Sequence, residues 1–221
     1  MTIYFGFIPT PELNQQLDDV IDMVANRPEE AFYPRQLEVT NQIAHEILEN
    51  LFVKLVEIID DPKRKEKMKK VVANIHSAVD SMLKHIIVEH PNDKVEDAFK
   101  FLLDDCLFTD NDGIRRVGFL MPENQGQKVV DDFATAKTAD DPHDMLIEVM
   151  DIIIETNLDH YLTDFSKHLH LGMLKRKAIP LAETAINKAS SVAIHKLLPD
   201  MDNDACKRLV THFEQFIIVK A

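Results

Sequence analysis

Apolar side chains recur every three or four residues along most of the chain, which is the spacing of one face of an amphipathic helix. The pattern predicts a helix from Pro11 to Asn26 and a long helix over residues 34–60. A second long helix is expected over residues 62–90, and a shorter one carries Val95 to Leu103. Because prolines interrupt the chain where these stretches meet, we expect a helical hairpin followed by a closing helix.

The same cycle begins again after the turn Asp110–Gly113. The elements expected in this second half are a strand over Ile114–Met121, a helix over Lys128–Ala136, a long helix from Asp141 to Gly172, its partner over residues 179–198 and a last helix capped by Asp202. The only other stretch with extended character is Ile3–Ile8, near the N-terminus.

The two halves also align with each other. Residues Leu37–Phe108 superpose on Ile147–Ile218 without a gap at an offset of about 110, and Gly6 meets Gly118 at an offset of about 112. We therefore predict an all-α fold made by tandem duplication of a helical unit of about 110 residues. The units would be residues 1–110 and 111–221, related by a pseudo-two-fold axis within one compact body.

In this fold the long antiparallel hairpins form a helical bundle, because each must bury its apolar face against another helix. The stretches Ile3–Ile8 and Val117–Met121 are expected to form at most a minor two-stranded β-ribbon. We expect these two stretches to pair with each other across the pseudo-two-fold axis or to lie over the end of the bundle.

Composition sets the cellular context that we expect. The 221 residues are 45% hydrophobic and contain no run of about 18 apolar residues that could cross a membrane. The apolar N-terminus lacks the basic flank and the cleavage site of a signal peptide. Cys106 and Cys206 are too few for a disulfide framework and do not align between the halves. A cytoplasmic protein with free thiols is therefore expected.

The formal net charge of -13 makes nucleic acid an unlikely partner, because phosphates would be repelled. Positive charge is nevertheless concentrated at the expected tips of the two hairpins. The residues concerned are Lys63, Arg64, Lys65 and Lys67 in the first half and Lys175, Arg176 and Lys177 in the second. Positive charge at a helix start opposes the helix dipole, so these tips are candidate binding sites for an anionic partner, with a solvated helix end as the ordinary alternative.

One helix face of the second half has a pattern that suits a divalent metal. His160, Asp164 and His168 are spaced at i, i+4 and i+8, and Asn157 lies one turn earlier. Imidazole and carboxylate groups so placed can bind Zn²⁺ if another helix completes the shell. The alternative is a plain polar stripe, and the first half has Asn50, Lys54 and Ile58 in its place.

His85 and His195 occupy equivalent positions in the two halves. A histidine near the end of a helix is most often a capping group, because the dipole there favours positive charge. As the alternative, the two rings would meet at the pseudo-two-fold axis as a pH-sensitive pair.

The sequence contains no motif for nucleophilic catalysis and no glycine-rich phosphate loop. We therefore expect a cytosolic interaction or regulatory protein that binds a protein or other anionic partner, with self-association into a homo-oligomer left open, rather than an enzyme. The alternative is a hydrolase-like helical enzyme that uses a divalent metal at the polar stripe. A third hypothesis, a small apolar ligand held between the hairpins, stays open because such pockets leave no sequence signature.

Overall fold

The computed structural model describes residues 1–220, apart from the side chain of Leu197. The amphipathic pattern of the first half folds into the elements β1 (Thr2–Phe7), α1 (Pro11–Asn26), α2 (Tyr33–Leu48), the π-helical segment η1 (Glu49–Val53), α3 (Lys54–Ile58), α4 (Pro62–Ile86), α5 (Asn92–Asp105) and β2 (Leu107–Thr109). The second half folds into β3 (Arg115–Leu120), α6 (Glu123–Ala136), α7 (His143–Leu158), η2 (Asp159–Asp164), α8 (Phe165–Lys167), α9 (Met173–Arg176), α10 (Ala178–Val192), η3 (Ala193–Leu197), α11 (Asn203–Glu214) and β4 (Ile217–Lys220).

The described elements of the two halves follow nearly the same order. Tyr33 begins α2 and His143 begins α7, 110 residues later. Glu49 and Asp159 begin η1 and η2 at the same separation. The helix α6 begins at Glu123, several residues before the start that the sequence pattern suggested, and its position then corresponds to that of α1.

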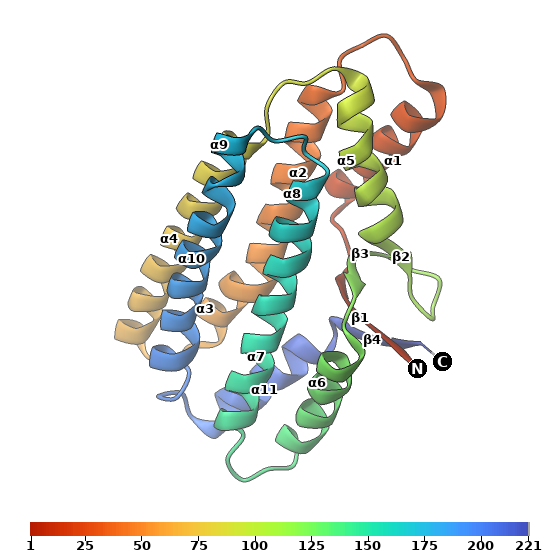
Figure 1. Ribbon diagram of the computed structural model, residues 1–221. Helices are drawn as coiled ribbons and strands as arrows, with labels where there is room; N and C mark the ends of the chain where they lie inside the picture. The colour runs from red at the N-terminus through yellow and green to blue at the C-terminus, as the bar shows by residue number, and fades with distance from the viewer. Residues whose placement is uncertain (221) are drawn as a thin grey trace.

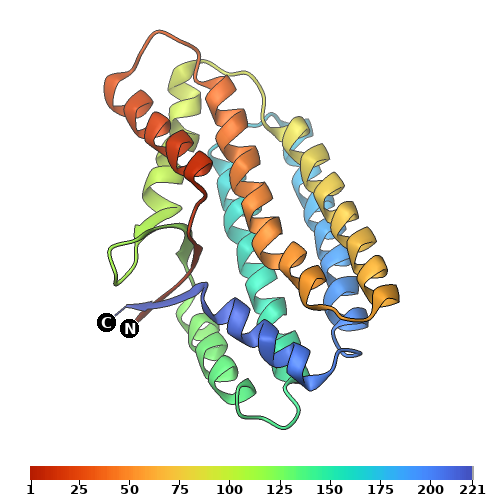
Figure 2. The ribbon, with the colours of Figure 1, turned by 180° about the vertical axis from the view of Figure 1, so that it is seen from behind.

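The four long helices form a bundle on one side of the molecule, and the sheet lies on the other (Figure 1). The outermost pair is α4 and α10, which pack along each other and run in opposite directions. Seen from behind, α2 and α7 lie between this pair and the sheet (Figure 2). The helices α1 and α5 cover one end of the sheet, and α6 and α11 cover the other (Figures 1 and 2). The expected bundle of long hairpins is thus present.

The β-structure is larger than the sequence pattern suggested. The described strands form one antiparallel sheet of four strands in the order β2-β3-β1-β4, with β1 and β3 paired at its centre. The expected pairing of the two extended stretches is confirmed, with Gly6 opposite Gly118. The fold is therefore mostly helical but not all-α. Both outer strands are short and directly follow a helix, so in the sequence their apolar residues look like a continuation of the preceding amphipathic helix. With these two strands added, the sheet is more stable than a lone two-stranded ribbon.

Residues of both halves contribute to a single hydrophobic core. The sheet supplies Phe5, Phe7 and Phe119, and the bundle supplies residues such as Leu55 and Met68. None of the described helices has the length and apolar character of a membrane-spanning segment.

Candidate functional site

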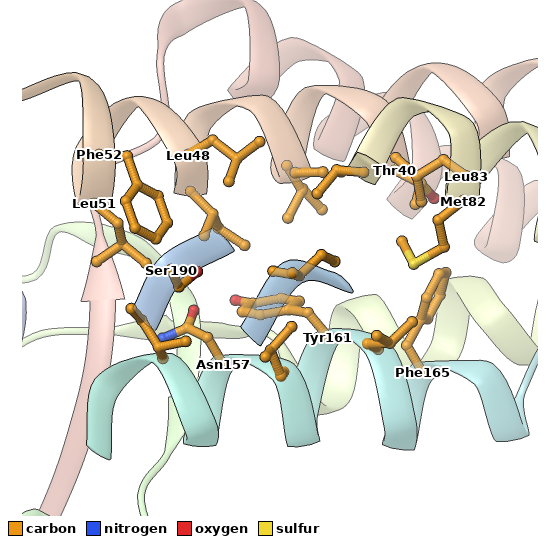
Figure 3. Close-up of a pocket in the computed structure, with 18 of the residues that line it drawn as sticks. Thr40, Leu48, Leu51, Phe52, Met82, Leu83, Asn157, Tyr161, Phe165 and Ser190 are labelled. Carbon is orange, nitrogen blue, oxygen red and sulfur yellow. The ribbon is translucent and has the colours of Figure 1, made fainter. Parts of the chain in front are cut away.

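A cavity of about 100 Å³ lies between the long helices of the bundle (Figure 3). Its walls come from α2 and η1 on one side, from α7, η2 and α8 on the other, and from α4, α5 and α10. The lining is dominated by the apolar side chains of Ile43, Ala44, Ile47, Leu48, Leu51, Phe52, Val79, Met82, Leu83, Leu102, Ile154, Leu158, Leu162, Phe165 and Ile186. The cavity is thus lined largely by hydrocarbon, and both halves contribute to its lining.

Four polar side chains interrupt this apolar lining: Thr40, Asn157, Tyr161 and Ser190. In each, one oxygen atom is buried and has no hydrogen-bond partner in the described structure. Seven buried side-chain atoms of this kind occur in residues 1–220, and four of them belong to this one cavity. Buried polar atoms are normally paired, because an unpaired one costs about 1–3 kcal/mol. Four such oxygen atoms at one cavity are therefore unusual, and a molecule bound there would provide their hydrogen-bond partners.

Three of these four oxygens gather in the same part of the cavity. Figure 3 shows the polar ends of Asn157, Tyr161 and Ser190 close together, whereas Thr40 lies toward the opposite end. The amide nitrogen of Asn157 already donates a hydrogen bond to the carbonyl oxygen of Ile153, at 2.7 Å. Its carbonyl oxygen is therefore left as an acceptor, and the two hydroxyl groups can each donate or accept.

The backbone around the cavity departs from ordinary α-helix on two sides. Leu51 and Phe52 come from η1, and Tyr161 and Leu162 come from η2. Segments of π-helix are rare and are found frequently at functional sites. Asn157, at the end of α7, and Tyr161, in η2, both line the cavity.

The site is electrically neutral. None of the described residues that line it is Asp, Glu, Lys, Arg or His. Burial raises the pKa of the Tyr161 phenol well above its usual value, and the nearby Cys106 raises this pKa further. The phenol therefore stays protonated at physiological pH. An ionised ligand would find no opposite charge in this apolar space, and its desolvation would be uncompensated.

Apolar volume left unfilled is destabilising. At about 24 cal/mol per Å³, a fully enclosed cavity of about 100 Å³ would cost about 2 kcal/mol if nothing filled it. One water molecule could bridge the three clustered oxygens, since a buried water needs two to four polar partners. The apolar remainder of the cavity would still lack contacts, so a molecule with both a polar and an apolar part suits the site better than water.

The predicted metal-binding stripe is arranged differently from a regular helix face. The ring of His160 stacks on Phe119 with the centroids 4.6 Å apart, and that of His168 stacks on Phe101 at 4.9 Å. Asp164 pairs with the ammonium group of Lys167. Because His160 and Asp164 both lie in η2, four residues no longer complete a turn there. No group of three His, Cys, Asp or Glu side chains in residues 1–220 is arranged to hold a metal ion.

His160 instead contacts a thiol. Its Nε2 atom lies 3.3 Å from the Sγ atom of Cys106. Burial lowers the pKa of His160 to about 4, and burial together with the charge of Asp105 raises that of Cys106 well above its usual value. Both groups are therefore neutral near pH 7, which is the opposite of an activated cysteine–histidine ion pair.

The two basic tips lie at opposite ends of the bundle, because α4 and α10 run in opposite directions (Figure 1). Lys63, Arg64, Lys65 and Lys67 begin α4, where the guanidinium of Arg64 contacts the backbone carbonyl oxygen of Asp200. Lys175, Arg176 and Lys177 lie in and just after α9. The same antiparallel packing separates His85, near the end of α4, from His195 in η3, so these two histidines do not meet.

The sequence pattern pointed to only one member of the cavity's polar group, Asn157, and assigned it to the metal stripe. A signal for the others existed in the alignment of the two halves. In this alignment Asn157 falls on Ile47 and Tyr161 falls on Leu51, so the second half has polar groups where the first half has hydrocarbon. Ser190 and Thr40 carry no comparable signal, because single small polar residues are common on helices.

Comparison of this chain with protein-family models, with curated proteins and with solved structures found no match.

Proposed function

We propose that this protein binds a small neutral molecule in the cavity between its long helices. The observation that carries the proposal is the convergence of three unpartnered buried oxygens, of Asn157, Tyr161 and Ser190, in one apolar cavity. A bound ligand would satisfy these oxygens and fill the apolar volume together. This develops the third hypothesis from the sequence, a ligand held between the hairpins, and leaves docking of a partner at the basic tips as a separate role.

The polar group of the ligand can be specified from the donors and acceptors available. The carbonyl oxygen of Asn157 needs a donor, and the hydroxyl groups of Tyr161 and Ser190 can both donate to an acceptor. A hydroxyl group fulfils both requirements, because it donates one hydrogen bond and accepts two. The ligand is therefore a small alcohol or phenol with an apolar body. Its size is limited by the cavity of about 100 Å³: since apolar cavities of about 150 Å³ hold benzene, the site accepts no more than a single small ring.

The test compares two probes that differ in one group, p-cresol and toluene. We expect p-cresol to raise the melting temperature and to bind at least tenfold more tightly than toluene, as measured by calorimetric titration. The tenfold preference corresponds to about 1.4 kcal/mol, the size of one or two satisfied hydrogen bonds. Equal affinities for the two probes, or no binding of either, would contradict the proposal.

A double variant separates the polar recognition from the apolar cavity. Asn157→Ile with Tyr161→Leu gives the second half the residues that the first half has at Ile47 and Leu51. We expect this variant to stay folded and to bind toluene while losing its preference for p-cresol. Asn187→Ile is the matched control, since Asn187 is exposed on α10, and it should bind both probes like the original protein.

We further infer that the chain arose by tandem duplication and that its halves are related by a pseudo-two-fold axis through the centre of the sheet. Supporting this, Gly6 donates a backbone hydrogen bond to Phe216 at 2.8 Å, and Gly118 donates one to Cys106 at 2.9 Å. The two donors, Gly6 and Gly118, align with each other between the halves, and so do the two acceptors, Cys106 and Phe216. A cytoplasmic location is also our proposal, supported by two free and buried cysteines.

A further inference from the structure

The start of the second hairpin's returning helix carries an exposed apolar surface. Met173 and Leu174 on α9 and Leu181 on α10 have exposed fractions of 78, 84 and 73%. They are the three most exposed large hydrophobic residues described in the chain. Leu174 and Leu181 are seven residues apart, or about two helical turns, so these two side chains lie on the same side of the helix, and Met173 directly precedes Leu174. We call these residues, with the basic residues between them, the α9 tip.

Positive charge surrounds these apolar side chains. Lys175, Arg176 and Lys177 lie between Leu174 and Leu181, and none of them forms an ion pair with another residue in 1–220. Further positive groups lie close by. Burial lowers the pKa of His90, and the charges of Lys94, His170 and Lys175 lower it further. The α9 tip is therefore basic in a chain whose net charge is -13.

The equivalent tip of the first half differs in one respect. Lys63 and Arg64 occupy the positions of Met173 and Leu174, and Val71, which is only half-exposed, occupies that of Leu181. Both tips are basic, but only the α9 tip exposes large apolar side chains among its cations. The duplication thus supplies an internal control that has the charge without the apolar surface.

We propose that the α9 tip docks on an anionic membrane surface. Met173, Leu174 and Leu181 would enter the boundary between headgroups and acyl chains, and Lys175, Arg176 and Lys177 would face anionic headgroups. Surface-bound helices combine apolar and basic residues in this way. Charge complementarity selects this occupant, because the acidic remainder of the protein is repelled by the same surface and only the two basic tips are attracted to it. Of these two tips, the α9 tip alone adds large exposed apolar side chains. The proposal is independent of the cavity ligand.

Sedimentation with lipid vesicles tests this docking. We expect the protein to bind phosphatidylcholine vesicles that contain phosphatidylserine and to bind pure phosphatidylcholine vesicles much less. Changing Lys175, Arg176 and Lys177 to Gln should weaken binding on the order of a hundredfold, since each cation near such a surface contributes about fivefold. Changing Met173, Leu174 and Leu181 to Ser should weaken it roughly tenfold or more. All six residues are at the surface, and circular dichroism should confirm unchanged folding.

The control changes Lys63, Arg64 and Lys67 to Gln at the opposite tip, which alters the net charge equally and should leave vesicle binding unchanged. Three outcomes would overturn the proposal. One is no binding to the phosphatidylserine vesicles, and another is an equal loss of binding in the control variant. The third is a concentration-dependent dimer that the serine variant abolishes, which would make the α9 tip a contact between two copies of the chain.

Discussion

The two halves of this protein supply two unlike walls to one cavity. The first half contributes Ile47 and Leu51, which are buried hydrocarbon. At the equivalent positions the second half contributes Asn157 and Tyr161, whose side-chain oxygens have no hydrogen-bond partner within residues 1–220. The two π-helical segments that carry or flank these residues correspond in position, so the backbone is alike where the side chains differ.

This difference shows which positions can vary between two halves that have nearly the same order of elements. Burying an amphipathic face requires apolar residues at a fixed spacing, and this holds both halves to a similar pattern. A polar group at such a position costs stability unless it gains a partner. In the second half this loss of stability would be offset if a ligand pairs with the polar groups. The first half has the apolar residues that stability alone favours at these positions.

The largest expected effect concerns the centre of the sheet, where Gly6 and Gly118 face each other. A β-carbon added at Gly118 would collide with the backbone of Phe5 and Gly6, whereas one added at Gly6 would chiefly meet the ring of Phe108. We expect Gly118→Ala to lower the free energy of unfolding by about 4 kcal/mol or more, because the central strands must separate.

For Gly6→Ala we expect a loss of about 1–2 kcal/mol, because the side chain of Phe108 can move. Chemical denaturation of both variants measures the difference. Similar losses in the two would mean that the strands adjust equally on both sides, and the proposed asymmetry at the centre of the sheet would be wrong.

The second prediction concerns pH and His160, which aligns with Asn50 in the first half. The pKa of His160 falls from 6.5 to about 4 on folding because the ring is buried. The unfolded chain therefore binds a proton first as the pH decreases, and stability is lost between about pH 6.5 and pH 4. The loss is at most about 3 kcal/mol, since one pKa unit corresponds to about 1.4 kcal/mol and the ring is partly exposed.

The variant His160→Asn introduces the residue of the first half and should remove this part of the pH dependence. Denaturation at several pH values between 7.5 and 4 measures the slope, which is independent of any constant change in stability. Asn187→Ile, an exposed change on α10 that involves no titratable group, should keep the slope of the original protein. If His160→Asn also kept it, the acid sensitivity would arise elsewhere.

The sequence was sufficient for the parts of the fold that depend on burial. Stripes such as Leu13, Leu17 and Val20 identify a helix because their spacing has only one simple explanation, and all three are buried. The strands β2 and β4 were missed, because Leu107–Thr109 and Ile217–Lys220 are too short to show a period of two after an amphipathic helix.

The cavity could not be predicted, because an apolar residue that lines a void has the same character in the sequence as one in a filled core. Leu158 and Phe165 belong to the helical stripe on either interpretation. The metal stripe relied on regular α-helical geometry from Asn157 to His168, and η2 breaks that regularity. Asn157 consequently faces the cavity, while His160 lies against Phe101 and Phe119.

The smallest effect is expected at the starts of α1 and α6, which again differ between the halves. The hydroxyl oxygen of Thr10 caps α1 by accepting a hydrogen bond from the backbone nitrogen of Leu13, at 3.2 Å. The equivalent Pro122 gives α6 no side-chain cap. Thr10→Ala should lower the free energy of unfolding by about 1 kcal/mol, whereas Thr10→Ser, which retains the acceptor, should change it by less than about half of that. Pro122→Thr should stabilise the protein by up to about 1 kcal/mol in the same denaturation assay.

The result for Pro122→Thr decides how the effect at Thr10 is explained. If Pro122→Thr left the stability unchanged while Thr10→Ala still lowered it, the loss at Thr10 would come from its contact with Glu46. The carboxylate of Glu46 also accepts a hydrogen bond from the backbone nitrogen of Thr10, at 3.0 Å. The helix start would then be held by a tertiary contact that the second half does not need, and the halves would differ in how they attach α1 and α6 rather than in how they cap them.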